Sequence, residues 1–186
     1  MILMGKIFVT SDIWFNRPMG PYSDRNIDEY NDTVISNWNN VVGANDTVYL
    51  LGGIGVGDVY DLIIKLNGHI VILDSFYTDE EKETSNLLKN HIENSVVGDV
   101  KNRIVFSDRQ IEVLPESDCV LSYFGLTDWC GKDSGTFCFH GRELKSVFSE
   151  NNVSCNAIRH NLTPISISDI KDVILTIENV KKGCYI

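Results

Sequence analysis

Long apolar runs and basic residues are both scarce in this sequence. A membrane-spanning helix needs about 20 consecutive apolar residues, and no segment approaches that length. The first six residues are too short for the apolar part of a secretory signal and lead directly into a predicted strand. The chain has 16 lysines and arginines but 26 aspartates and glutamates, which gives a formal net charge of −10. Because general binding to a nucleic-acid backbone requires many cationic side chains, we expect a cytoplasmic protein that binds neither such a backbone nor a membrane.

Cysteine and histidine are too sparse to indicate a disulfide framework or a zinc site. The five cysteines include no Cys-x-x-Cys pair and no zinc-type spacing. We therefore expect free and mostly buried thiols in a reducing compartment. Of the four histidines, His69, His91 and His160 are scattered along the chain and are expected to be solvated or half-buried.

The first half of the chain contains a regular alternation of short apolar runs with amphipathic segments. Apolar runs at 7–9, 48–51 and 70–73 are typical of buried strands, and apolar residues recur at helical spacing over 25–42. A second long helix is expected to run to about residue 94. Strands that alternate with helices predict parallel pairing through right-handed crossovers. Ser23 or Asp24 is the expected cap of the first helix, and residues 78–81 form a capping box before the second long helix.

The second half changes to a strand-rich pattern without repeats or linkers. The runs at 104–106 and 111–114 are joined by a short polar turn and predict a hairpin. A last helix, capped by Ser168, is expected to end at Gly183. We predict an α/β protein with a single domain over 1–186, and the further strands expected are 119–123, 136–140 and a weaker one around 153–157.

A carboxylate, Asp12, stands directly after the first predicted strand. The carboxyl ends of the strands are where open α/β sheets usually place their ligands. Residues 6–17 resemble the first motif of calcineurin-like metallophosphoesterases of the small bacterial and phage type, a strand followed by Asp-x-His-Phe-(Gly/Asn)-His. Asp12, Phe15 and Asn16 match that motif, whereas Trp14 and Arg17 stand where it has histidines.

The resemblance extends over nearly the whole chain and implies the fold of that family. Segments 37–39, 41–43, 46–49 and 66–68 resemble its scaffold segments in order and spacing, and 163–167 resembles its closing segment. The implied fold is a two-sheet β-sandwich flanked by helices. The implied cofactors are two divalent metals such as Mn, Fe or Zn, about 3.5–4 Å apart, which clamp a phosphate and activate a bridging hydroxide.

The positions that would hold those metals depart from the family pattern. Gly53 replaces the aspartate that bridges both metals, and residues 74–77, Asp-Ser-Phe-Tyr, occupy the Gly-Asn-His-Asp position. Tyr123 replaces a ligand histidine. One carboxylate, Asp12, remains from the ligand set, and one carboxylate cannot hold two metals.

The last motif is altered as well, and it completes a degenerate active-site cleft. The segment 140–144 lies over His-Gly-His-x-His and retains the first histidine, His140, which is not a ligand and is expected to be structural. Asp74 could ligate a metal in principle, but the neighbouring Ser75 and Tyr77 are poor ligands for the rest of a shell. We assign no catalytic residue and no cofactor, and the predicted cleft residues are Asp12, Trp14, Arg17, Gly53, Asp74, Ser75, Phe76, Tyr77, Tyr123, His140, Arg142 and Leu144.

These departures favour a catalytically inactive protein that acts by binding. The partner would be a phosphate-bearing small ligand or an unknown protein, and the resemblance to phage members would permit an inhibitor of a host protein. The alternative is a residual metal-dependent phosphodiesterase with an altered metal site. We also expect the aromatic residues to close the cleft, and Arg142 or else Arg17 to pair with Asp12 in place of the metals.

Overall fold

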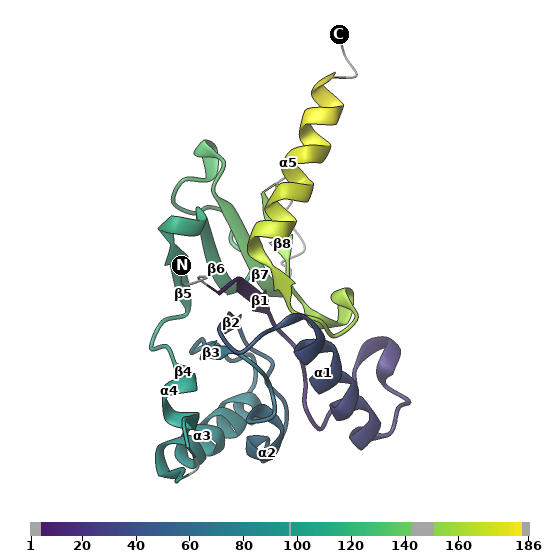
Figure 1. Ribbon diagram of the computed structural model, residues 1–186, viewed down its shortest axis with the longest axis vertical. Helices are drawn as coiled ribbons and strands as arrows, with labels where there is room; N and C mark the ends of the chain where they lie inside the picture. Colours follow the sequence, from purple (N-terminus) through teal and green to yellow (C-terminus); the bar gives the residue numbers. More distant parts are fainter. Residues whose placement is uncertain (1–4, 97, 143–150, 184–186) are drawn as a thin grey trace.

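Two mixed sheets face one another in this chain, with helices outside the first of them. The computed structural model describes residues 5–96, 98–142 and 151–183. The first sheet has the strand order β4-β3-β2-β1-β9 and the second β5-β6-β7-β8. Figure 1 shows the second sheet beside the first, with α1, α2 and α3 on the other side of the first sheet. The predicted α/β architecture with two sheets and flanking helices in one domain is therefore confirmed at this level.

The first sheet is built from the predicted βαβ alternation. Its parallel strands pair in register, Phe8 with Val48 and Val48 with Ile70, and β9 joins β1 in the antiparallel direction. The N-terminal cap of α1 is Asn26, whose side chain accepts hydrogen bonds from two backbone amides. The elements are β1 (Ile7–Thr10), α1 (Ile27–Val41), β2 (Thr47–Leu50), α2 (Tyr60–Ile63), β3 (His69–Ile72), α3 (Asp79–Asn94), α4 (Val100–Arg103), β4 (Ile104–Phe106) and β9 (Ile165–Ser166).

Alternating side chains of the first sheet separate two hydrophobic cores. Phe8 and Val48 face the helices and join Tyr30 and Trp38 of α1 in one cluster. Val9 faces the second sheet and belongs to another cluster. Since side chains alternate between the faces of a strand, one apolar run supplies side chains to both hydrophobic cores. This explains why these strands are apolar almost without interruption.

The second sheet packs on the first through its inner face and carries a smaller cluster on its outer face. Leu121, Tyr123 and Phe139 point inward, whereas Val120 and Cys138 lie on the outer side beneath Trp129. Its elements are β5 (Ile111–Leu114), β6 (Cys119–Phe124), β7 (Phe137–Arg142) and β8 (Asn152–Ser154), and the 3-10 turns η1 (Gly20–Tyr22), η2 (Pro115–Ser117), η3 (Lys132–Ser134) and η4 (Ala157–His160) complete the connections.

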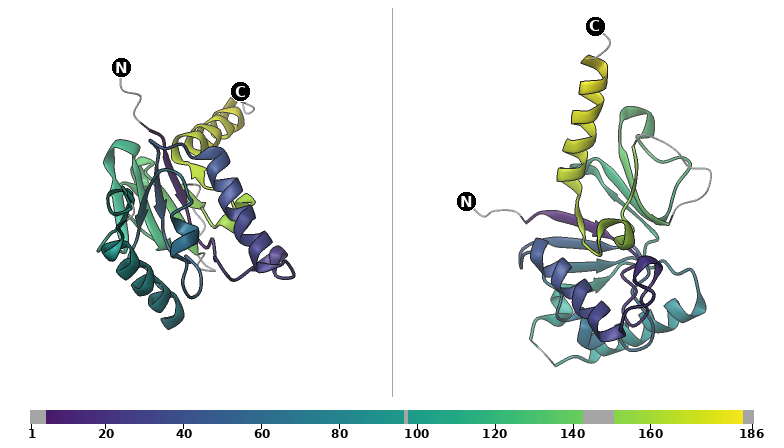
Figure 2. Two further views of the ribbon diagram at one scale, coloured as in Figure 1. Left: turned by 60° about the horizontal axis from the view of Figure 1, so that its bottom comes forward. Right: turned by 90° about the vertical axis from the view of Figure 1, so that its right-hand side faces the viewer.

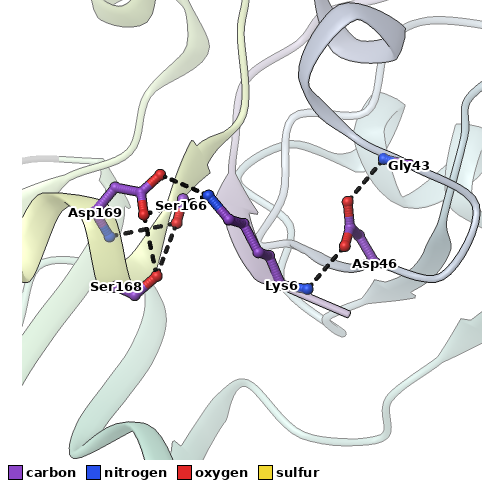
Figure 3. A network of polar contacts seen from close by, with 6 residues as sticks. All are labelled: Lys6, Gly43, Asp46, Ser166, Ser168 and Asp169. Carbon is purple, nitrogen blue, oxygen red and sulfur yellow. Dashed lines mark hydrogen bonds and ion pairs between the residues drawn. The ribbon is translucent and has the colours of Figure 1, made fainter. Parts of the chain in front are cut away.

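The last helix, α5 (Ile167–Gly183), starts beside β1 and β9. It extends away from the sheets, as the right-hand view of Figure 2 shows. Its first turn is held by a polar network drawn in Figure 3. Lys6 Nζ lies 3.1 Å from Asp169 Oδ2, and the Lys6 backbone amide donates to Asp46 Oδ1 at 2.7 Å. The side chains of Lys6 and Asp169 are mostly exposed, so this ion pair contributes little stability and mainly orients the start of the helix. None of the helices in the described part of the chain has the length and apolar character needed to cross a bilayer.

Three sequence predictions about the elements are wrong. The runs 104–106 and 111–114 do not form a hairpin, because β4 pairs with β3 in the first sheet and β5 pairs with β6 in the second. The first helix is capped by Asn26 and not by residues 23 or 24. The last helix begins at Ile167, and the Asp169 amide donates to Ser166 Oγ at 3.3 Å, so Ser166 and not Ser168 provides the cap.

Candidate functional site

The loop after β1 has a strained backbone, and hydrogen bonds to the loop after β2 hold it in place. Asp12, Trp14 and Asn16 have φ angles of 54°, 47° and 64°, in the left-handed region that non-glycine residues avoid. The Asp12 amide donates to the Gly52 carbonyl at 2.8 Å, and the Trp14 amide donates to the Gly53 carbonyl at 3.0 Å. Residues with such strain cluster at functional sites, so the loop has the backbone character of a site.

Asp12 is buried, and neutral donors take both of its carboxylate oxygens. Oδ2 accepts from Ser11 Oγ at 2.9 Å and from Asn156 Nδ2 at 3.0 Å, and Oδ1 accepts from the Tyr123 hydroxyl at 2.9 Å. Asn156 reaches this position because the Ser11 backbone pairs with the segment after β8. Sequence reasoning missed Asn156, since nothing local indicates a contact between positions 144 residues apart.

Tyr123 connects Asp12 to a second buried carboxyl group, that of Glu81. Its hydroxyl lies 3.2 Å from Glu81 Oε1, while Glu81 Oε2 accepts from the backbone amides of Tyr77 and Thr78, each at 2.7 Å. A phenol has one hydrogen and can donate to only one carboxylate at a time. The sequence identified Glu81 as part of the predicted capping box, which is confirmed, but its contact with the cleft was missed.

Burial has the largest effect on the pKa values of Asp12 and Tyr123. Desolvation raises the pKa of Asp12, against the lowering effect of the hydrogen bonds from Ser11 and Tyr123 and of the positive charge of Arg142. The pKa of Tyr123 is also raised by burial and by the neighbouring carboxyl groups of Asp12 and Glu81. The phenol therefore stays protonated and acts as a fixed donor.

The backbone at Gly53 leaves no room for the aspartate that the family pattern would place there. Gly53 has a φ angle of 65°, and an added Cβ would lie 2.6 Å from Asp12 Cα and 2.7 Å from Asp12 Oδ1. Real Cβ atoms do not approach other heavy atoms this closely. In this arrangement the loop excludes a second carboxylate next to Asp12.

The four aromatic residues that were expected to close the cleft differ in burial. Trp14 and Tyr123 are buried, and Phe76 is half-buried. Tyr77 is 61% exposed, and the guanidinium of Arg142 lies over its ring at 3.9 Å from the centroid. Of the four rings, two are therefore buried, one is half-buried and one is exposed.

The predicted ion pair between Asp12 and an arginine is wrong. Among the described residues neither arginine forms an ion pair with Asp12, because Arg17 pairs with Glu80 at 2.7 Å and Arg142 stacks on Tyr77. Arg142 acts on Asp12 through its charge without a direct bond. Three neutral hydrogen bonds, and not a cation, accommodate the buried carboxyl group.

The remaining predicted cleft residues differ in burial. Asp74 is exposed, Ser75 is buried with its amide bonded to the Leu73 carbonyl, and His140 is buried in β7. Leu144 lies outside the described residues.

A polar cavity of about 260 Å³ opens beside the Asp12 group, where β7 and β8 end. Asn156, which donates to Asp12, also lines this cavity, and two arginines, Arg142 and Arg159, contribute positive charge to its wall. Ser154 and the backbone of Gly141 complete the lining. Guanidinium forks and amide donors in one small cavity are suited to an anion such as phosphate.

The residues present do not fit a pair of divalent metals. Within 5–96, 98–142 and 151–183 no group of three or more His, Cys, Asp or Glu side chains could hold a metal ion. Both oxygens of Asp12 already accept hydrogen bonds, and the space for a bridging aspartate at Gly53 is taken. Hard cations of this type need several carboxylate, amide or imidazole ligands, and this donor set does not supply them.

Comparisons with known proteins give a fold and no function. No family model matches the sequence. The uncharacterized protein MJ1445 of Methanocaldococcus jannaschii is 39% identical over 79 residues, a match that covers 38% of this chain and 45% of that protein, so less than half of the relative's length is spanned. The crystal structure of the protein of unknown function AQ665 from Aquifex aeolicus is similar with a TM-score of 0.61, and the match covers 91% of this chain and 99% of that chain. Since the two are 14% identical, this similarity shows the fold alone.

Proposed function

We propose that this chain is a catalytically inactive protein with the fold of calcineurin-like phosphoesterases, and that it binds a phosphate-bearing small ligand beside the former metal site. The observation that carries the proposal is the polar cavity lined by Arg142, Arg159 and Asn156, directly next to the hydrogen-bonded Asp12. A cavity of about 260 Å³ accommodates a phosphate group with part of its substituent.

The chemistry of the neighbouring group supports binding over hydrolysis. Asp12 is engaged by three neutral donors, and Gly53 leaves no space for a second metal-binding carboxylate. A metal-activated hydroxide needs open ligand positions on such carboxylates. Arginine side chains, in contrast, stay charged at any relevant pH and can bind an anion without any metal.

Calorimetric titration with inorganic phosphate and pyrophosphate tests the proposal. We expect saturable binding that Arg159→Gln weakens at least about tenfold, the loss expected for one charged hydrogen-bonding partner. Lys65→Gln, which removes an exposed positive charge at the end of α2, is the matched control and should leave binding unchanged. Equal weakening by both variants would show a general charge effect and contradict a specific site.

The enzyme alternative is tested separately with bis-p-nitrophenyl phosphate in the presence of manganese. We expect no turnover above that of the Asp12→Asn variant. A turnover that Asp12→Asn abolishes would establish a residual phosphodiesterase and overturn the proposal. If neither binding nor turnover is observed, a protein partner becomes the better explanation, and capture of a defined host protein would have to support it.

A further inference from the structure

A pocket of about 350 Å³ lies along β4, the outer strand of the first sheet (Figure 1). Ile104, Val105 and Phe106 of β4 line it together with residues of α3 and α4. Ile104 and Phe106 belong to the helix side of the strand, whereas Val105 lies on its opposite face and is 42% exposed. Residues on both faces of one strand can line the same pocket only at the free edge of that strand. The pocket therefore follows the open edge of the first sheet.

The backbone of β4 offers unpaired hydrogen-bonding groups at this edge. The Ser107 amide donates to the Ile72 carbonyl of β3 at 2.8 Å. Because the backbone groups of successive strand residues point alternately to either side, the amide and the carbonyl of Phe106 point away from β3. No hydrogen bond between described residues uses either group. An extended segment can pair with such free groups, as peptides do at the edges of other sheets.

The pocket has an apolar floor and a positively charged rim. Ile92 of α3 is buried and Phe106 is half-buried, and together they form part of the floor. Lys89 and Lys101 are exposed on the rim beside one acidic residue, Glu93. Neither lysine side chain forms an ion pair or a hydrogen bond with another described residue. In a chain with a formal net charge of −10, this local excess of positive charge favours an acidic partner.

We infer that the edge of β4 binds an extended segment of a partner protein, which adds to the sheet as a further strand. The segment would place an apolar side chain in the pocket and a carboxylate beside Lys89 and Lys101. In strand addition the main-chain hydrogen bonds supply affinity, and pockets for alternate side chains supply selectivity. A second copy of the chain fits less well, because a symmetric contact would bring two rims of the same charge together. The inference goes beyond the proposed function, since this pocket shares no lining residue with the cavity beside Asp12.

Selection of random heptapeptides displayed on phage, with the whole chain as the target, supplies the probe. We expect the selection to enrich peptides that alternate apolar with polar residues and that carry Asp or Glu. Fluorescence polarisation with the most enriched peptide, made synthetically, then measures its affinity. Lys89→Glu should weaken binding about fivefold or more, because the reversal replaces an attraction at the rim by a repulsion. Lys82→Glu is the matched control, since Lys82 is an exposed lysine two turns earlier on the same helix and lies outside the pocket, and it should change the affinity by less than about twofold.

Two N-methylated forms of the same peptide test the strand pairing itself. Alternate amides of an added strand point toward β4 and away from it. N-methylation of the set that points toward β4 should weaken binding about tenfold or more, and N-methylation of the other set should change it by less than about threefold. This difference between alternate amides is not expected for a peptide that binds through its side chains alone.

The possible outcomes decide the inference without touching the proposed function. A selection that enriches no peptide, or only peptides rich in Lys and Arg, overturns the inference. Equal weakening by Lys89→Glu and Lys82→Glu, or equal binding of the two N-methylated forms, also overturns it. A dimer in sedimentation velocity that Lys89→Glu dissociates would make a second copy the occupant and has the same consequence. Circular dichroism of each variant, with wild-type signal required, excludes loss of the fold, and phosphate titration of Lys89→Glu reports on the proposed function separately.

Discussion

The hydroxyl of Tyr123 donates to Asp12 Oδ1 at 2.9 Å, from the opposite sheet of the sandwich. The Tyr123 hydroxyl oxygen also lies 3.2 Å from Oε1 of Glu81, which is at the start of α3. One side chain on β6 thus joins the loop after β1 to the capping box of a helix. This contact provides the buried carboxyl group of Asp12 with a donor, in addition to those of Ser11 and Asn156.

Tyr123→Phe should destabilise the fold by about 1–3 kcal/mol, because it leaves buried carboxyl oxygens of Asp12 and Glu81 without their donor. The free energy of unfolding in urea measures the effect. Tyr22→Phe is the matched control, since the Tyr22 hydroxyl bonds to Asn161 at the surface and its loss should cost under about 1 kcal/mol. If both variants lose the same unfolding free energy, the buried hydrogen bond of Tyr123 contributes no more stability than the surface hydrogen bond of Tyr22.

The stability of the fold should depend on the ionisation of Asp12. Burial raises the pKa of this carboxyl above its ordinary value of 3.8, so the folded state holds the proton more tightly than the unfolded state. The stabilising contribution of Asp12 to the unfolding free energy is therefore present in full below pH 3.8, the ordinary pKa expected in the unfolded state. It is lost as the pH rises through the pKa of Asp12 in the folded state. In Asp12→Asn the amide can donate to the Tyr123 oxygen, and this dependence disappears.

The difference in unfolding free energy between wild type and Asp12→Asn isolates this effect from the other titrating groups. We expect it to shift in favour of the variant as the pH rises from 4, and to become constant once Asp12 is ionised in the folded state. A difference that shifts in favour of wild type over the same range would show that the Asp12 pKa is lowered by its donors, and would contradict the prediction.

The parts of the fold that depend on neighbouring residues could be predicted from the sequence. The apolar runs gave the parallel strands, and Thr78 with Glu81 gave the start of α3, because a capping box needs only residues three positions apart. The position of Asp12 at a strand end followed from the same local pattern. Each of these features is determined within a few residues.

The pairings between distant segments could not be predicted in the same way. The polar turn at 107–110 connects two sheets, and nothing in its length distinguishes that from a hairpin. Asn156 and Glu81 reach Asp12 and Tyr123 only after both sheets have packed. Arg142 was expected at Asp12, but the exposed Tyr77 ring offers the guanidinium a contact without the cost of burying its charge.

The described cysteines should differ sharply in reactivity. Burial raises the pKa of Cys119 to about 12 and that of Cys138 to about 11, and the pKa of the buried Cys155 is also raised well above its ordinary value. Since the thiolate is the reactive form, these three should resist iodoacetamide in the folded protein at pH 8, whereas the exposed Cys130 reacts. Peptide mass mapping assigns each label, and labelling in urea provides the reference. Modification of Cys155 as fast as Cys130 would contradict the packing described.

Gly53 offers the sharpest test of the idea that the loop geometry itself excludes the metal site. Gly53→Ala should cost about 2–5 kcal/mol of unfolding free energy, because a left-handed backbone disfavours any side chain and the new Cβ would collide with Asp12 at 2.6 Å. Gly57→Ala is the matched control: its φ angle is 72°, but nothing lies within 4 Å of an added Cβ, so only the backbone cost of about 1–2 kcal/mol remains. Urea denaturation measures both variants. If Gly53→Ala is no more costly than Gly57→Ala, the loop can move away from Asp12, and its geometry does not exclude a side chain at position 53.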